Sequence, residues 1–201
     1  MNRLFTVVTL FLTYSVFSQT FQVENTFEMV FRKSKVNSKN EWKTASLNIH
    51  GPSALKKIQI RFEINTLSGK KEVFDPNKFY LVSELNKIRV RPVDFTFHDY
   101  AHVFTSFEKL SCDPVEKNKF GLTYDPEIKD FFNDYKIAGY TDIDNEIDFG
   151  TKKKALVVKT YSKPIEWKSN LIDIYAFIPE NLNSIDIYYG SQKLMLVELK
   201  E

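Results

Sequence analysis

The stretch LIDIYAFIPENLNSIDIYYGSQKLMLVELKE, residues 171–201, decides the fold. Its first part has an apolar residue at every second position, so one face of an extended strand is apolar: Ile172, Ile174, Ala176 and Ile178. Pro179-Glu180-Asn181 ends this strand, because Pro fixes φ and Asn tolerates turn geometry. A second alternating run, residues 184–189, leads through the turn signal Gly190-Ser191 to a third strand, Leu194–Leu199. The stretch therefore predicts an antiparallel meander.

The first of these strands is apolar on its other face as well, apart from Asp173. Two apolar faces indicate a central position between packed layers. The segment Leu55–Thr66 is different, because only one of its faces is apolar: Ile58, Ile60, Phe62 and Ile64. This pattern predicts a strand with one face in the core and the other in water.

The remaining chain repeats this pattern of short alternating runs and turns. About ten short strands in one domain, residues 19–201, predict an all-β fold, an antiparallel Ig-like β-sandwich. A lipocalin-like β-barrel is the alternative, although no glycine-x-tryptophan signature marks the first strand. Pro92 inside the run Lys87–Phe97 indicates an edge strand or a bulge. The only helix expected is a short one, Glu127–Tyr135, within a long polar insertion, Leu110–Tyr140.

Residues 1–18 have the features of a secretory signal peptide. Arg3 supplies a positive charge, Leu4–Phe17 is apolar but too short for a membrane span, and Val16-Phe17-Ser18 fits a cleavage site. A buried first strand or helix is the alternative. The signal predicts an exported protein, periplasmic or secreted, whose mature chain has no transmembrane segment.

The composition disfavours nucleic-acid binding. The formal net charge is only +2, from 28 basic and 26 acidic residues, and Arg3 would leave with the signal. The single basic triplet, Lys152-Lys153-Lys154, is interpreted as the solvent-exposed start of a strand. A lone cysteine, Cys112, has no partner for a disulfide within the chain, so stability must come from the hydrophobic core.

Two stretches resemble a family of bacterial Ig-like extracellular domains of unknown function. Asp75–Val82, continuing to Ile88–Pro92, resembles that family's segment of phenylalanine, x and leucine leading to arginine-proline. Tyr175–Glu180, followed by Ile185–Tyr189, resembles its closing strand and last hairpin. The resemblance implies a secreted β-sandwich that mediates interactions and has no catalytic residues. This chain departs from the family in its long insertion and in lacking a lipidation cysteine after the signal.

One row of carboxylates alternates with other residues: Asp142, Asp144, Glu146 and Asp148. In a loop these oxygens could bind calcium; in a strand they would form a solvated acidic face. The match to the calcium-loop template is poor, since Ile147 stands where glycine is required. Both interpretations stay open.

Two further combinations of reactive side chains are present. His98 and His102 are four residues apart, a spacing that could bind zinc or belong to an ordinary surface pair. Cys112 could be a nucleophile, but the adjacent Asp113 works against a thiolate, so a bystander thiol is the alternative.

Four aromatic residues lie near expected loops: Trp42, Tyr140, Tyr161 and Trp167. Such residues either form exposed faces that bind sugars or proteins, or pack at the ends of the sandwich. Without a catalytic set, we expect a non-enzymatic module that binds an envelope or extracellular protein or glycan. The alternatives are a barrel-type carrier of small ligands or glycans and a metal-dependent hydrolase.

Overall fold

The fold is described from a computed structural model. It describes residues 19–37, 41–43, 48–50, 55–99, 102–105, 109–110, 129–144, 147–148, 157–158, 160–162 and 164–199. The signal-peptide prediction for residues 1–18 lies outside this part of the chain. The same holds for the predictions on Cys112, Glu146 and Lys152–Lys154.

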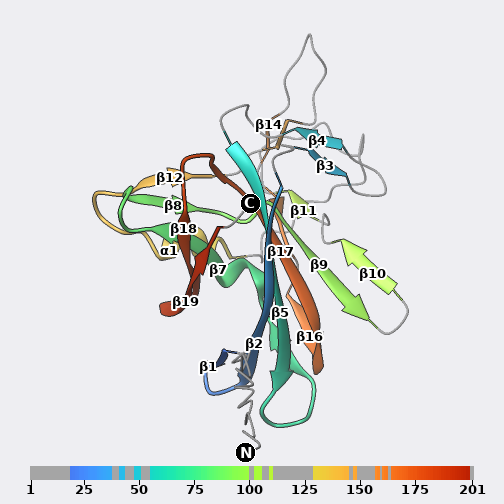
Figure 1. Ribbon diagram of the computed structural model, residues 1–201. Coiled ribbons are helices and arrows are strands. Elements are labelled where there is room, and N and C mark those ends of the chain that lie inside the picture. Colours follow the sequence, from blue (N-terminus) through green and yellow to red (C-terminus); the bar gives the residue numbers. More distant parts are fainter. Residues whose placement is uncertain are drawn as a thin grey trace, which may run out of the picture.

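The larger of the two main sheets has six antiparallel strands in the order β1-β2-β5-β17-β9-β10 (Figure 1). Their bounds are β1 Thr20–Val23, β2 Phe27–Asn37, β5 Leu55–Thr66, β17 Ser169–Pro179, β9 Asp94–Asp99 and β10 His102–Thr105. The central strand β17 is buried on both faces, which confirms the prediction from its two apolar faces.

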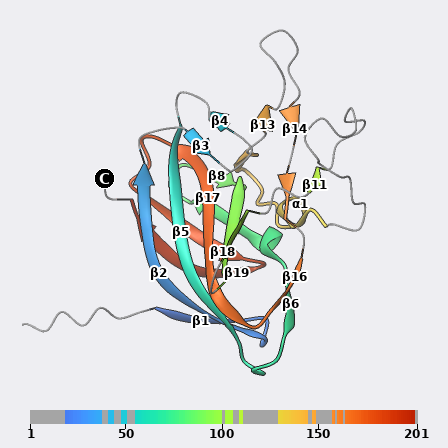
Figure 2. The ribbon, with the colours of Figure 1, turned by 90° about the vertical axis from the view of Figure 1, so that its right-hand side faces the viewer.

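The second main sheet has five strands in the order β12-β8-β7-β18-β19. Their bounds are β12 Thr141–Ile143, β8 Ile88–Val90, β7 Phe79–Ser83, β18 Ser184–Tyr189 and β19 Gln192–Glu198. Strands β12 and β8 are parallel, and the other pairs are antiparallel. In Figure 2 the strands β18 and β19 cross behind β2 and β5.

Short elements complete the described chain. Four two-stranded pairs are β6 (Glu72–Phe74) with β16 (Ile165–Trp167), β3 (Glu41–Lys43) with β4 (Asn48–His50), β11 (Lys109–Leu110) with β15 (Thr160–Tyr161), and β13 (Ile147–Asp148) with β14 (Val157–Val158). A 3₁₀ turn, η1 (Pro76–Lys78), precedes β7, and α1 (Phe131–Asp134) lies within the predicted helix Glu127–Tyr135.

The two main sheets enclose one hydrophobic core. The predicted inward residues of β5 and β17 are fully buried: Ile58, Ile60, Phe62, Ile64, Ile172, Ile174, Ala176 and Ile178. Within this core, Phe74 packs its ring against Phe27, Trp167 and Tyr189 at centroid distances of 5.4, 5.9 and 5.6 Å. The sheets keep separate edges in the described chain, so the fold is an all-β sandwich and the lipocalin-like barrel alternative is wrong.

The predicted C-terminal meander is only partly correct. Its three strands and two turns exist, but β17 belongs to the six-stranded sheet while β18 and β19 form a hairpin in the other sheet. The chain crosses between the sheets at Glu180–Asn183, where the buried Leu182 carbonyl accepts a hydrogen bond from Lys56 Nζ at 3.0 Å. Pro92 lies at a similar crossing between β8 and β9, and therefore lies in neither strand.

Candidate functional site

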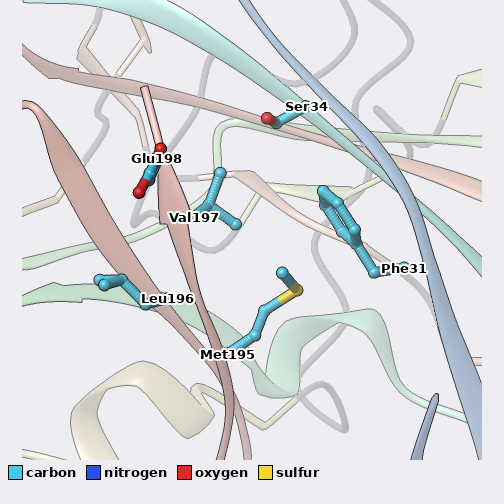
Figure 3. A pocket seen from close by; sticks show the side chains of 6 residues that line it. All are labelled: Phe31, Ser34, Met195, Leu196, Val197 and Glu198. Atoms are coloured by element: carbon cyan, nitrogen blue, oxygen red, sulfur yellow. The ribbon is translucent and has the colours of Figure 1, made fainter. Parts of the chain in front are cut away.

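A groove of about 350 Å³ lies between strands β2 and β19. It is lined by Phe31, Ser34, Met195, Leu196, Val197 and Glu198. Figure 3 shows the two residues from β2 on one side and the four from β19 on the other. The groove therefore lies between β19, the last strand of the five-stranded sheet, and β2, the second strand of the six-stranded sheet.

Within the described residues, both strands have a backbone edge without a strand partner at this groove. Strand β1 pairs with β2 only between Phe27 and Val30, and the Phe31 N–H donates to the Gln19 carbonyl at 2.9 Å. From Lys33 to Asn37, β2 pairs with β5 alone within the described chain. Strand β19 likewise pairs only with β18 among the described strands. Such edges present backbone N–H and C=O groups to any extended chain that comes near.

A β-bulge positions the polar group of the groove. The register of β2 against β5 shifts between Phe31 and Lys33, so Arg32 is an extra residue. Phe31 and Ser34 are three positions apart and would lie on opposite faces of a regular strand. The bulge brings both to the inward face, because Phe31 is paired with Phe62 and Ser34 with Ile60.

Four of the six residues that line the groove are apolar, the other two are Ser34 and Glu198, and the exposed residues of β2 beside it are basic. Phe31, Met195 and Val197 face inward, whereas Leu196 is 55% exposed on the edge strand. The outward positions of β2 beside the groove are the exposed Arg32, Lys33 and Lys35. The arrangement fits a ligand with apolar side chains. Lys33 and Lys35 favour carboxylates beside β2, whereas Arg32 is paired with Glu63 and the acidic Glu198 lines the β19 side.

The structure accounts for two of the four carboxylates considered for calcium. Arg89 Nε and Nη2 each donate to Asp142 at 2.8 Å, and Arg91 Nε donates to Asp144 at 2.5 Å. Asp148 lies in β13 but its side chain is outside the description, as is all of Glu146. No three metal-ligating side chains come together among the described residues. The four-carboxylate calcium site stays a prediction.

His98 and His102 lie on the paired strands β9 and β10. The antiparallel register places His98 opposite Val103 and His102 opposite Asp99. The His102 side chain is outside the described part, so a zinc site formed by this pair stays a prediction. His98 contacts Asp173, with 2.7 Å between Nε2 and Oδ2.

The four candidate aromatic residues do not form one described patch. Trp167 is only 7% exposed, and its Nε1–H donates to the Ile64 carbonyl at 2.8 Å, so this side chain packs within the sandwich, one of the two alternatives left open by the sequence. Tyr140 is half-buried, with Lys87 Nζ 4.9 Å from its ring centroid. Trp42 lies in β3 and Tyr161 in β15, but their side chains are outside the described part.

The groove was not predicted from the sequence. One signal in the sequence of β2 could have indicated it. The alternating apolar residues stand at odd positions up to Phe31, but the next apolar residue, Val36, stands at an even position. Such a change marks a bulge within a strand, although it does not show what lies opposite.

Comparison with protein-family models, with curated proteins and with solved structures finds no match to this chain. Among the described residues, no helix has the length and apolar character needed to cross a membrane. The class of protein is therefore defined by its own architecture: an all-β sandwich with a groove between two strand edges.

Proposed function

We propose that this chain is an exported, non-enzymatic Ig-like binding module of the bacterial envelope or extracellular space. Its ligand is an extended peptide segment of another envelope or extracellular protein, held in the groove between β2 and β19. The observation that carries the proposal is the apolar groove bordered by two strand edges that have no further strand partner in the described chain.

Strand addition is the binding mode that this geometry supports. An extended segment pairs with the side of β19 that has no strand partner among the described strands, and alternate side chains enter the groove. Strand β19 is the better template because its exposed residue Leu196 is apolar. The edge of β2 carries Lys33 and Lys35 beside a bulge, which are features that protect a strand edge from pairing.

Selection of peptides from a displayed random library tests this proposal. We expect peptides with alternating apolar residues and acidic flanks, and their binding should protect the amides of β19, Gln192–Glu198, from hydrogen exchange. Ser34→Tyr fills the groove from its inward face and should weaken peptide binding at least tenfold, or about 1.4 kcal/mol. Calorimetric titration gives the affinities.

Val73→Ala is the matched control, because Val73 is an exposed apolar residue on β6, away from the groove. It should leave the affinity unchanged. Failure to enrich any peptide, protection of another strand, or full binding by Ser34→Tyr would each contradict the proposed groove function.

The export part of the proposal has its own test. Production of the full chain in a Gram-negative host with an intact secretion pathway should give a protein outside the cytoplasm that begins at Gln19. Intact mass and N-terminal sequencing identify that end. A chain that stays cytoplasmic with residues 1–18 attached would show that this segment is not a signal peptide.

A further inference from the structure

A ladder of four aromatic rings crosses the outer face of the five-stranded sheet. Its successive centroid distances are 6.3 Å for Phe131–Tyr135, 5.8 Å for Tyr135–Tyr80 and 5.1 Å for Tyr80–Tyr188, with interplanar angles of 17°, 17° and 16°. Tyr80 lies opposite Tyr188 in the β7–β18 register. Their sequence neighbours Leu81 and Ile187 are in the core, so both tyrosines face outward.

The segment 129–144 covers only part of this face. It packs over β7 and β8. The Phe132 and Tyr80 rings meet edge to face with 6.5 Å between their centroids, and Arg89 Cζ lies 4.2 Å from the Phe132 ring centroid. Tyr80 is consequently buried, whereas Tyr188, one strand further on, is half-buried and ends the ladder. We call the group of residues around Tyr188 the tyrosine ledge; it comprises Tyr80, Tyr135, Tyr140, Tyr188, Asp186 and Lys193.

Polar groups of both signs surround the end of the ladder. Lys193, opposite Tyr188 in the register, donates to Asp186 Oδ2 at 2.8 Å. The Asp186 side chain is only 6% exposed, and its Oδ1 has no hydrogen-bond partner among the described residues. A buried carboxylate oxygen without a partner costs free energy, so a donor that reaches it is favoured.

The local charges balance. Two lysines, Lys193 and Lys87, and two carboxylates, Asp186 and Glu84, lie around Tyr188 and its neighbour Tyr140. A ledge without net charge does not favour an anion or a cation, but it offers donors and acceptors to a ligand rich in hydroxyl groups.

We propose that the tyrosine ledge binds a pyranose ring of a neutral oligosaccharide on the outer face of Tyr188. The C–H face of the sugar carries partial positive charge and packs on the electron-rich face of the aromatic ring. Sugar hydroxyls accept from the half-exposed Lys193 and donate to the Asp186 carboxylate, whose Oδ1 has no hydrogen-bond partner among the described residues.

This site lies on the opposite face of β18 and β19 from the inward residues of the peptide groove, although Leu196 of the groove lining lies opposite Asp186 in the register. Asp186 and Tyr188 occupy outward positions of their sheet, whereas Met195 and Val197 face inward toward β2. Each proposal can therefore fail without the other, and variants on the two faces distinguish the failures.

Titration of the mature protein with soluble hexasaccharides of glucose, N-acetylglucosamine, xylose and mannose tests the ledge. We expect calorimetric binding of at least one of them and movement of the Tyr188 and Tyr140 ring resonances in NMR spectra. Tyr188→Ala and Asp186→Asn should each weaken that binding tenfold or more. The groove variant Ser34→Tyr and the distant Val73→Ala should leave it unchanged.

Tyr188→Phe keeps the ladder and should retain most of the affinity, which separates loss of the sugar contact from loss of folding. Lys193→Ala alters a half-exposed side chain and gives a second folded variant, with the same tenfold loss expected. Absence of binding by all four hexasaccharides at millimolar concentration overturns the proposal. Unchanged affinity in folded Lys193→Ala and Asp186→Asn does so as well.

Discussion

Replacing Arg89 with Met should lower the free energy of unfolding by about 3 kcal/mol. Arg89 is 0% exposed, the most completely buried charged residue among the described side chains. Its Nε and Nη2 hold Asp142 as a bidentate pair, and its Nη1 donates to the Phe132 carbonyl at 3.0 Å and to the Tyr135 carbonyl. A methionine of similar length leaves the carboxylate and both carbonyls without these donors.

The effect should also be local, because Arg89 joins three parts of the segment 129–144 to β8. Loss of buried-pair partners commonly costs 3–5 kcal/mol, and the lower end applies because Asp142 is 31% exposed and can be hydrated. Hydrogen exchange should therefore show the amides of 131–143 opening before the six-stranded sheet does.

Urea unfolding of wild type and variants measures the change. Arg89→Lys retains the charge but not the planar fork that serves Asp142 and the carbonyls together, so it should be destabilised too. Arg32→Met is the control: Arg32 pairs with Glu63 at the surface, where an ion pair contributes about 1 kcal/mol or less. Equal losses for Arg89→Met and Arg32→Met would show that the buried fork does not hold the segment.

The strands were predictable because burial on one face leaves a local signature. In Leu55–Thr66 every second residue is buried, as the sequence indicated. Which strand pairs with which was not predictable from that signature, since a break at Pro179-Glu180-Asn181 serves a hairpin or a crossing between sheets equally well. The structure places a crossing there, and this separates β17 from β18.

The arginine partners of Asp142 and Asp144 could have been predicted by comparing the spacing of charged residues in two segments of the sequence. Asp142 and Asp144 are two residues apart, and so are Arg89 and Arg91, which bind them from the neighbouring strand. Equal spacing of opposite charges on two strands indicates cross-strand pairs. The aromatic ladder gave no such signal, because its rings come from separate elements that only tertiary folding brings together.

Asp173 should give the second large effect, with a dependence on pH that identifies its cause. Its side chain is 2% exposed in the central strand β17. Arg61 donates to Oδ1 and Oδ2 at 2.6 Å each, and His98 Nε2 lies 2.7 Å from Oδ2. Burial alone would raise the pKa of Asp173, but the hydrogen bonds from Arg61 and His98 outweigh it and hold the pKa below 3.8.

The sign of the pH dependence follows from that direction. A carboxyl whose pKa is lower in the folded protein stabilises the fold fully above its unfolded pKa, here 3.8, and loses this contribution as the pH falls through the folded pKa. Asp173→Asn should therefore lose about 3 kcal/mol at neutral pH, since it leaves the half-buried Arg61 without its carboxylate. The difference from wild type should shrink as the pH falls below 3.8.

Urea unfolding of both proteins from about pH 5 to about pH 2 measures this convergence. Glu63→Gln is the matched control, because hydrogen bonding by Arg32 also lowers the pKa of Glu63, but at an exposed site. The free energy of unfolding of Glu63→Gln should be lower than that of wild type by about 1 kcal/mol or less. A deficit of Asp173→Asn that remained constant across the acid range would mean that side-chain shape, and not the charge of Asp173, stabilises the central strand.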